Sequence, residues 1–275
     1  HVAHTSTFNS AGFAPGSESV FQQWQNLIGP GYGIGRFPNP GEQTNYFAGN
    51  GLNVTTNTFW FGQVGQRVSV FNEQSSLAGT GIPNHYMYKL TDSLALATAL
   101  ERLDPSLTID RANAMFAAGS NQMAGSLEGV LDGLRRMLVG PGAAPTPTGD
   151  ASDSAQTRVD FHANLKALRD DPFVVALNGK VRIEPSGAHL GDLARSDFGA
   201  MAALLTLSPV WIRGNGTDDA ALTALWNSSA WTTQRTQWLA DANMTAADRE
   251  AGNQALTDDW IADRAAFLDA LLRYN

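Results

Sequence analysis

Residues 84–96 read Asn84-His85-Tyr86-Met87-Tyr88-Lys89-Leu90-Thr91-Asp92-Ser93-Leu94-Ala95-Leu96, and the character of the chain changes across them. The residues before this stretch are rich in glycine, asparagine and aromatic side chains, with strand-like runs. The residues after it are rich in alanine and leucine at helical spacing. Thr91 or Asp92 is the predicted N-cap of the helix that follows. The stretch therefore predicts a junction between a strand-containing part and a helical part.

His85 is the candidate catalytic residue at this junction, because it follows a turn and precedes a helix. A loop on a rigid scaffold can aim an imidazole at a substrate, and histidine changes its charge near neutral pH. The alternative is a loop histidine that only hydrogen-bonds a neighbour. Glu73 and Asp92 are the nearest carboxylates that could orient the imidazole. Glu73 follows a predicted strand and is the better placed of the two, although a surface glutamate and a helix-capping aspartate are the alternative readings.

The remaining histidines carry weaker signals. His1 and His4 are three residues apart and could share a metal only if that segment were helical, and no third ligand lies near them in the sequence. His162 and His189 fall on predicted helices among charged residues, where we expect them to face solvent.

Composition excludes several classes of function. The 275 residues carry a net charge of −8, which argues against nucleic acid as a partner. The chain has no cysteine, so disulfides, thiolate metal sites and a cysteine nucleophile are ruled out. No apolar run approaches the roughly 20 residues that cross a bilayer. Glycine–aspartate repeats that bind calcium are also absent, and we expect no metal or cofactor in these residues. The sequence leaves the oligomeric state open.

Strands are predicted in the first part of the chain, at Leu52–Phe61 and Gln66–Phe71 and in the segment that closes on Asn9–Gly12. Gly29–Gly51 is rich in glycine, proline and asparagine with aromatic residues between them, which is typical of a functional loop or lid. Its Gly31–Gly35 run is followed by neither the lysine nor the nearby helix of a phosphate-binding loop.

Helical spacing dominates after residue 104. The predicted helices run from Thr108 through Phe116, then over Leu127–Leu138, Ala155–Leu168, Asp171–Leu177, His189–Leu207, Asp218–Ala240 and from Thr245 onward. A lone strand is predicted at Lys180–Glu184. Gly140–Ser154, with its prolines and glycines, is predicted to be an exposed linker. No Gly-x-Ser-x-Gly nucleophile motif occurs anywhere in the chain.

Three short motifs resemble a known family. His1-Val2-Ala3-His4 is similar to the residues that follow the nucleophile elbow of lipases, and Phe8–Phe13 is similar to the strand after it. Asn84–Leu96 resembles the catalytic-histidine segment in class 3-type lipase-like domains of large secreted bacterial repeats-in-toxin proteins. The segments Arg195–Gly199 and Leu205–Pro209 are similar to the region that follows such a lipase core.

The resemblance implies an α/β fold. Residues 1–104 would be the C-terminal half of a lipase-like α/β-hydrolase domain, and residues 105–275 a mainly α-helical region. The chain would be a fragment of a secreted serine lipase or esterase acting on lipid carboxylic esters, with the nucleophile serine just before His1. Calcium would then bind only in repeats outside these residues. His85 would be the catalytic histidine and Glu73 the substitute acid, since the usual aspartate position near Gly62–Gln66 holds no carboxylate. The alternative is a non-catalytic helical scaffold or interaction module of a secreted toxin or adhesin.

Overall fold

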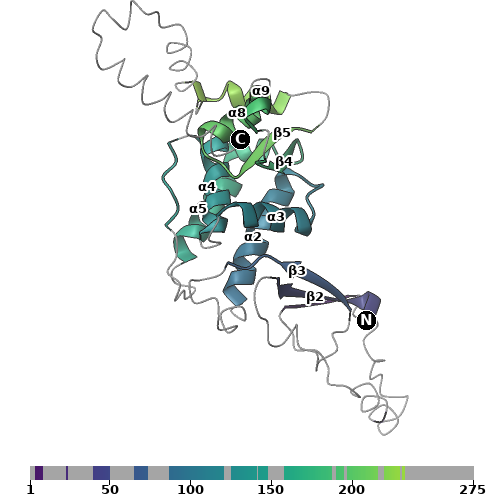
Figure 1. Ribbon diagram of the computed structural model, residues 1–275. Helices are drawn as coiled ribbons and strands as arrows, with labels where there is room; N and C mark the ends of the chain where they lie inside the picture. The colour runs from purple at the N-terminus through teal and green to yellow at the C-terminus, as the bar shows by residue number, and fades with distance from the viewer. Residues whose placement is uncertain are drawn as a thin grey trace, which may run out of the picture. The chain divides into compact units, whose positions relative to one another are not determined.

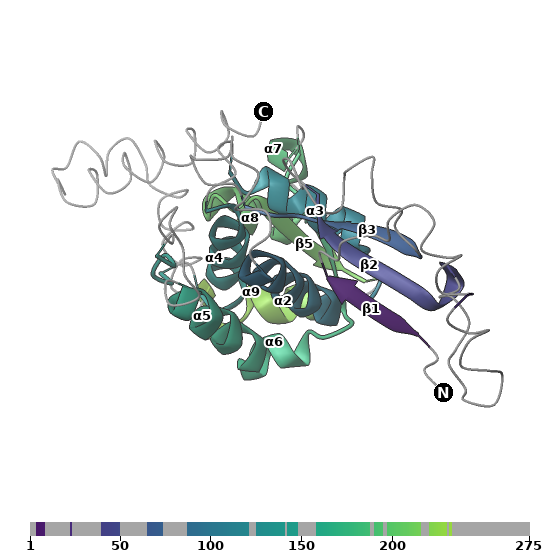
Figure 2. The same cartoon turned by 90° about the horizontal axis from the view of Figure 1, so that it is seen from below.

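A three-stranded parallel sheet lies near the start of the chain. The computed structural model describes residues 4–8, 23, 40–49, 65–73, 87–120, 125–140, 142–147, 158–187, 190–194, 197–215, 220–229 and 231–232. Strands β1 (Thr5–Phe8), β2 (Gln43–Ala48) and β3 (Gln66–Val70) are hydrogen-bonded in that order, and both pairs are parallel (Figure 2). A short 3-10 turn, η2 (Pro40–Glu42), leads into β2.

One face of this sheet packs against helix α2 (Met87–Leu103). Side chains alternate between the faces of a strand, so Tyr46 and Ala48 of β2 share a face. Ala48 and Val70 are fully buried and form a small core with Leu90 of α2. Tyr46 also stacks on Phe8, with ring centroids 5.4 Å apart. The strand-rich first part of the chain is therefore a sheet that carries a helix on one face.

The helices that follow α2 are mostly short. They are α3 (Ile109–Ala118), α4 (Ser126–Leu138), α5 (Val159–Asp170), α6 (Pro172–Ala176), α7 (Leu190–Leu193), α8 (Phe198–Leu205) and α9 (Ala220–Trp226) (Figure 1). Thr108 caps α3 and Asp171 caps α6 through side-chain oxygens that accept backbone N–H groups. These two caps confirm the predicted helix starts, because a side-chain oxygen satisfies an N–H that has no partner within the helix.

Helix α4 is the centre of the helical part, where it contacts α3, α5, α8 and β5. Its predicted apolar stripe is confirmed, since Leu127, Val130, Leu131, Leu134 and Leu138 are all buried. Trp231 is also fully buried, and its indole Nε1 donates to the backbone oxygen of Met137 at 2.7 Å. A tryptophan in a core finds such an acceptor because an unpaired N–H there is costly.

The strand predicted at Lys180–Glu184 is confirmed, but it is not a lone strand. Strand β4 (Val181–Pro185) pairs antiparallel with β5 (Val210–Gly214), which the sequence reading missed. The predicted helical range His189–Leu207 contains two helices, α7 and α8, because Asp197 is extended and caps α8 by accepting from Ala200 N.

Other boundaries also differ from the predictions. Helix α9 ends at Trp226 rather than continuing, and Ser228 Oγ donates to the backbone oxygen of Leu225 at the turn that follows. The predicted strand at Leu52–Phe61 and the helix from Thr245 onward lie outside the described residues, as does most of Asp218–Ala240 beyond α9.

The described part of the predicted exposed linker at Gly140–Ser154 contains no helix or strand and is largely exposed, but one of its residues is anchored. Thr146 is buried, and its backbone N and its Oγ1 each donate to a carboxylate oxygen of Asp132 at 2.6 Å. Arg135 Nη1 donates to the Ala144 oxygen at 2.8 Å, and Asn164 Nδ2 donates to Thr146 Oγ1 at 2.9 Å. These hydrogen bonds fix the segment around Thr146 to α4 and α5. They also offset the free-energy cost of burying the polar groups of Thr146.

Contacts divide the chain into two units, His1–Ala95 with Asp150–Ser152, and Leu96–Gly149 with Asp153–Asn275. The division falls within α2, nine residues before the boundary that we drew at residue 104. Mixed helices and two small sheets give the chain a broadly α/β character in the described residues.

Candidate functional site

The carboxyl ends of β1, β2 and β3 define the candidate site in the first unit. Parallel strands end on the same edge of their sheet, and open α/β sheets bind ligands beyond that edge. The strands end at Phe8, Ala48 and Val70. Gly49 N donates to the Val70 oxygen at 2.8 Å, so β2 and β3 finish level with each other. Gly49 and Phe71, which follow β2 and β3, are thus brought to one edge.

The chain continues from β3 through Phe71, Asn72 and Glu73. Phe71 and Asn72 are buried, and Glu73 is half-buried. The backbone oxygen of Glu73 accepts a hydrogen bond from Lys89 Nζ at 2.9 Å. Glu73 therefore lies beyond the carboxyl end of β3 and close to the first turns of α2.

Helix α2 places unusually many buried polar groups beside the sheet. Lys89, Asp92 and Ser93 are 7%, 2% and 0% exposed. Lysine and aspartate are almost never this deeply buried unless they are paired. Lys89 and Asp92 are three residues apart and so lie on the same side of the helix. The first turns of α2 combine a polar cluster with the apolar contact made by Leu90.

The predicted N-cap at Thr91 or Asp92 is wrong. Helix α2 already includes Met87, and Thr91 Oγ1 donates back to the Met87 oxygen at 2.9 Å. This back-bond within the helix is the usual contact of a threonine in a helix interior. Asp92 is thus a buried interior residue of α2, and its carboxylate does not cap the helix.

His85 lies outside the described residues, as do His1 and His189. The structure locates the two ends of the segment that contains His85, at Glu73 and at Met87. It brings Glu73 to the edge of the sheet but does not describe the relation between its carboxylate and the imidazole.

The predicted lid at Gly29–Gly51 is wrong over its last residues. Gln43–Ala48 is β2, the central strand of the sheet, and Tyr46 packs into its core. The glycine and asparagine residues on both sides of this strand are typical of loops, so the sequence did not predict it. The pairing of β2 with a neighbour on each side gives it the hydrogen bonds that its weak local propensity does not predict.

The other face of the sheet is polar. Thr7 Oγ1 donates to Asn45 Oδ1 at 3.1 Å, and Asn45 is fully buried. Arg67 lies over the Phe47 ring at 4.5 Å. On the face that carries Tyr46 and Ala48, by contrast, His4 Nε2 and Thr44 Oγ1 are hydrogen-bonded at 3.0 Å. His4 is not helical, whereas the metal pair that we considered with His1 requires a helix, and His1 lies outside the described residues. His162 is exposed on α5, as predicted.

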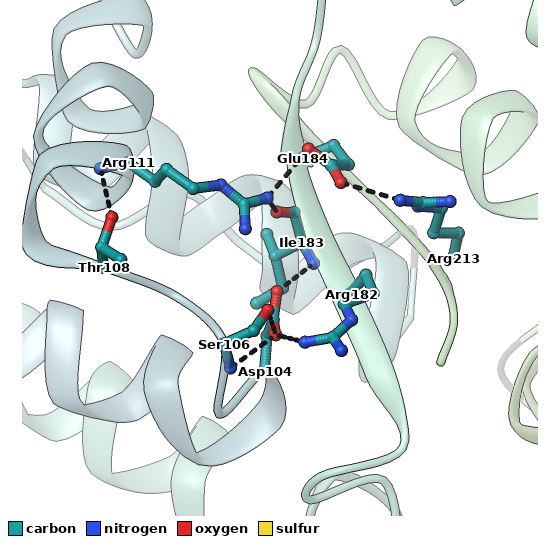
Figure 3. A network of polar contacts seen from close by, with 8 residues as sticks. All are labelled: Asp104, Ser106, Thr108, Arg111, Arg182, Ile183, Glu184 and Arg213. Carbon is teal, nitrogen blue, oxygen red and sulfur yellow. Dashed lines mark hydrogen bonds and ion pairs between the residues drawn. The ribbon is translucent and has the colours of Figure 1, made fainter. Parts of the chain in front are cut away.

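A second polar network lies in the helical unit and is centred on Asp104, a residue that no sequence motif marked. The Asp104 carboxylate is fully buried and accepts from Ser106 N and Oγ, from Ile183 N and from Arg182 Nη1 (Figure 3). Burial raises the pKa of Asp104, but the hydrogen bonds from Ser106, Ile183 and Arg182 outweigh that effect and hold it below its ordinary value.

The same network continues along β4 and β5. Arg111 Nη2 donates to Glu184 Oε2 at 2.9 Å, and Arg213 Nη2 donates to Glu184 Oε1 at 3.2 Å (Figure 3). Each of these carboxylates is thus bound by arginine side chains of the protein itself. We interpret this network as structural: it binds the connection between α2 and α3 to the β4–β5 sheet.

Metal and membrane features are not found in the described part of the chain. No group of three or more histidine, aspartate or glutamate side chains there is arranged to hold a metal ion. None of the described helices combines the length and the apolar character needed to cross a membrane.

Comparisons with known proteins add no relative. No protein-family model matches the chain, and no curated protein or solved structure is significantly similar to it.

Proposed function

We propose that this chain supplies the C-terminal part of an α/β-hydrolase domain from a secreted serine lipase or esterase. The serine nucleophile would precede His1, and His85 would be the catalytic histidine. The substrates would be carboxylic esters of lipids. The observation that carries the proposal is the order of the sheet: three parallel strands, adjacent in chain order, followed by the segment with His85 and then by helix α2.

This topology supports the proposal, because an α/β-hydrolase fold also places its triad residues beyond parallel strands. Triad residues in that fold follow the chain order serine, acid, histidine, and each lies beyond the carboxyl end of a strand. Glu73 follows β3 by three residues and precedes His85 in the sequence. The candidate acid and histidine therefore occur in the expected order.

The proposed reaction is acyl transfer to serine and then to water. His85 takes the serine proton as the oxygen attacks the ester carbonyl, and then gives that proton to the departing alcohol. In the second half, His85 activates a water that releases the fatty acid and restores the serine. Backbone N–H groups near the elbow would stabilise the oxyanion. Glu73 would hold the imidazole through its other nitrogen.

The second candidate is a non-catalytic scaffold or interaction module of a secreted toxin or adhesin. The observation that favours it is the absence of any aspartate or glutamate between Glu42 and Glu73. The carboxyl end of β2, at Ala48, is consequently followed by no carboxylate before β3 begins. A domain that had lost the triad carboxylate would still form the sheet but would not hydrolyse esters.

The test uses the polypeptide extended upstream through the residues encoded before His1. His85→Ala should lower kcat for a short-chain ester by at least about 10³-fold, because the serine then has no base. Glu73→Gln should lower it by about 10²–10⁴-fold through loss of imidazole orientation. His162→Ala is the matched control, since His162 is exposed on α5.

Two results would count against the enzyme. Unchanged turnover in His85→Ala removes the assigned base, and an upstream sequence without Gly-x-Ser-x-Gly removes the nucleophile. Either result leaves the scaffold as the better account. Loss of turnover in His162→Ala to the same extent would also show that the effect is not specific to His85.

A further inference from the structure

The outer edge of β4 is closed by side chains rather than by another strand. Strand β4 has β5 on one side, and in the described part of the chain no third strand joins this sheet. Residues of an antiparallel pair alternate between bonding the partner strand and pointing away from it. Ser186 N donates to the Pro209 oxygen at 2.8 Å, so Ile183, three positions earlier, is one of the residues that point away. The backbone N–H and C=O of Ile183 are therefore the groups that a further strand would bind.

Two side chains already occupy both of these backbone groups (Figure 3). Ile183 N donates to Asp104 Oδ2 at 3.1 Å, and the Ile183 oxygen accepts from Arg111 Nη2 at 3.0 Å. A carboxylate and a guanidinium thus take the places of the C=O and the N–H that a neighbouring strand would present. Pro185 is the next residue of β4 that faces this way, and a proline has no N–H to donate. The edge therefore has no free pair of backbone groups at its centre, Ile183.

A second copy of the same strand is the partner that this edge would fit. In an antiparallel pair of β4 strands with a two-fold axis at Ile183, Arg182 would face Glu184 of the second copy, and the reverse. Both of these cross-strand pairs have opposite charges, which favours pairing. The two copies of Ile183 would exchange N–H···O bonds, because each presents one donor and one acceptor. The uncovered edge would thus be complementary to itself in both hydrogen bonds and charge.

We propose that Asp104 and Arg111 prevent β4 from pairing with the β4 strand of a second copy of this chain. Exposed strand edges are templates for association between chains, and proteins block them with charged side chains and proline. Asp104 is fully buried, whereas the Arg111 side chain is 36% exposed and also binds Glu184. Arg111 is therefore the part of the block that a substitution can remove without opening the core. This role belongs to the second unit and does not depend on the proposed hydrolase activity.

Arg111→Met tests the block, and Arg213→Met is its matched control. Both substitutions take an arginine away from Glu184, but only Arg111→Met also releases the Ile183 oxygen. In sedimentation velocity over a range of concentrations, Arg111→Met should associate about tenfold more strongly than Arg213→Met, roughly the effect of one hydrogen bond. Equal association of the two variants would overturn the proposal. So would unfolding of both Arg111→Met and Arg111→Gln, because Arg111 would then be required for the fold itself.

Cross-linking identifies the strand that pairs. The chain has no cysteine, so only introduced thiols can form a disulfide. In the Arg111→Met background, a mixture of Arg182→Cys and Glu184→Cys proteins should form the mixed disulfide in preference to either homodimer, since these two positions would lie directly opposite. Homodimeric disulfides in its place would show a different interface and overturn the proposal. A mixed disulfide that forms equally fast with Arg111 retained would also overturn it, because the edge would then be open in the unsubstituted chain.

Discussion

Asp104 shows how one carboxylate can fasten two parts of a fold. It follows α2 directly, and it accepts hydrogen bonds from its own turn at Ser106 and from β4 at Arg182 and Ile183. Ionised carboxylates form the stronger kind of hydrogen bond, because the acceptor carries a full charge. A buried acid with this many donors favours its charged form.

The low pKa of Asp104 predicts a pH-dependent stability. Its pKa is lower in the folded chain than in the unfolded chain, where it is about 4. The stabilisation is therefore complete above about pH 4 and is lost as the pH falls through the lower folded-state value. Asp104→Asn should lower the free energy of unfolding by about 2 kcal/mol or more at pH 7, since it removes hydrogen bonds to a charge. The same substitution should flatten the loss of stability in acid.

Urea unfolding followed at pH 7 and at several values below pH 4 measures both effects. Asp170→Asn is the control. Hydrogen bonds from Arg169 and Lys166 lower the pKa of Asp170 as well, but this pair is exposed and solvent screens it. If Asp170→Asn proved as destabilising as Asp104→Asn, or if Asp104→Asn kept the full acid dependence, the account of Asp104 would be wrong.

Two capping residues, Thr108 and Asp171, were predicted correctly from the sequence. Thr108 and Asp171 act within two or three residues of the chain, so their sequence contains the whole interaction. Asp92 and Lys89 depend on which side of α2 is covered by the sheet, and the sequence near them carries no sign of that. The Asp104–Arg182 pair joins residues 78 positions apart, which local patterns cannot predict.

At the scale of elements, α8 and β5 approach each other more closely than side chains normally permit. A Cβ atom on Gly199 would collide with the backbone oxygen of Ile212 in β5. A backbone oxygen cannot rotate away as a flexible side chain can. Gly199 thus lets the first turn of α8 lie directly on the strand.

Gly199→Ala should destabilise the helical unit by about 1–3 kcal/mol, because the added methyl group overpacks a contact with backbone. Gly187→Ala is the matched control, since nothing lies within 4 Å of the Cβ position there. Thermal or urea unfolding of the two variants measures the difference. Equal stabilities would show that α8 can shift away from β5 without cost.

The element with the longest apolar period was predicted directly, whereas two short strands were missed. The apolar stripe of α4 extends over Leu127–Leu138 and specifies a helix by itself. Strands β2 and β5 have six and five residues, and their neighbours in sequence resemble loops. Each exists because a partner strand completes its hydrogen bonds. The segment around Thr146 was read as a linker for a similar reason, since its anchor Asp132 belongs to another element.

At the scale of the molecule, the two units differ in their architecture and in their polar groups. The first unit has a parallel sheet with Glu73 beyond the carboxyl end of β3, and the backbone oxygen of Glu73 accepts a hydrogen bond from the buried Lys89 of α2. The second unit is a helical assembly around α4 with a small antiparallel sheet. Among the described residues, the second unit contains internally paired charges that stabilise its packing. The proposed chemistry therefore belongs to the first unit.

The most direct measurement is covalent labelling of the upstream-extended polypeptide with a fluorophosphonate, which reacts with a serine that an adjacent base has activated. Mass spectrometry should find one modified serine in the residues before His1, and His85→Ala should abolish that labelling while His162→Ala keeps it. Labelling that survives His85→Ala, or the absence of any labelled serine in the unsubstituted protein, would contradict the assignment of this sheet edge to a serine hydrolase.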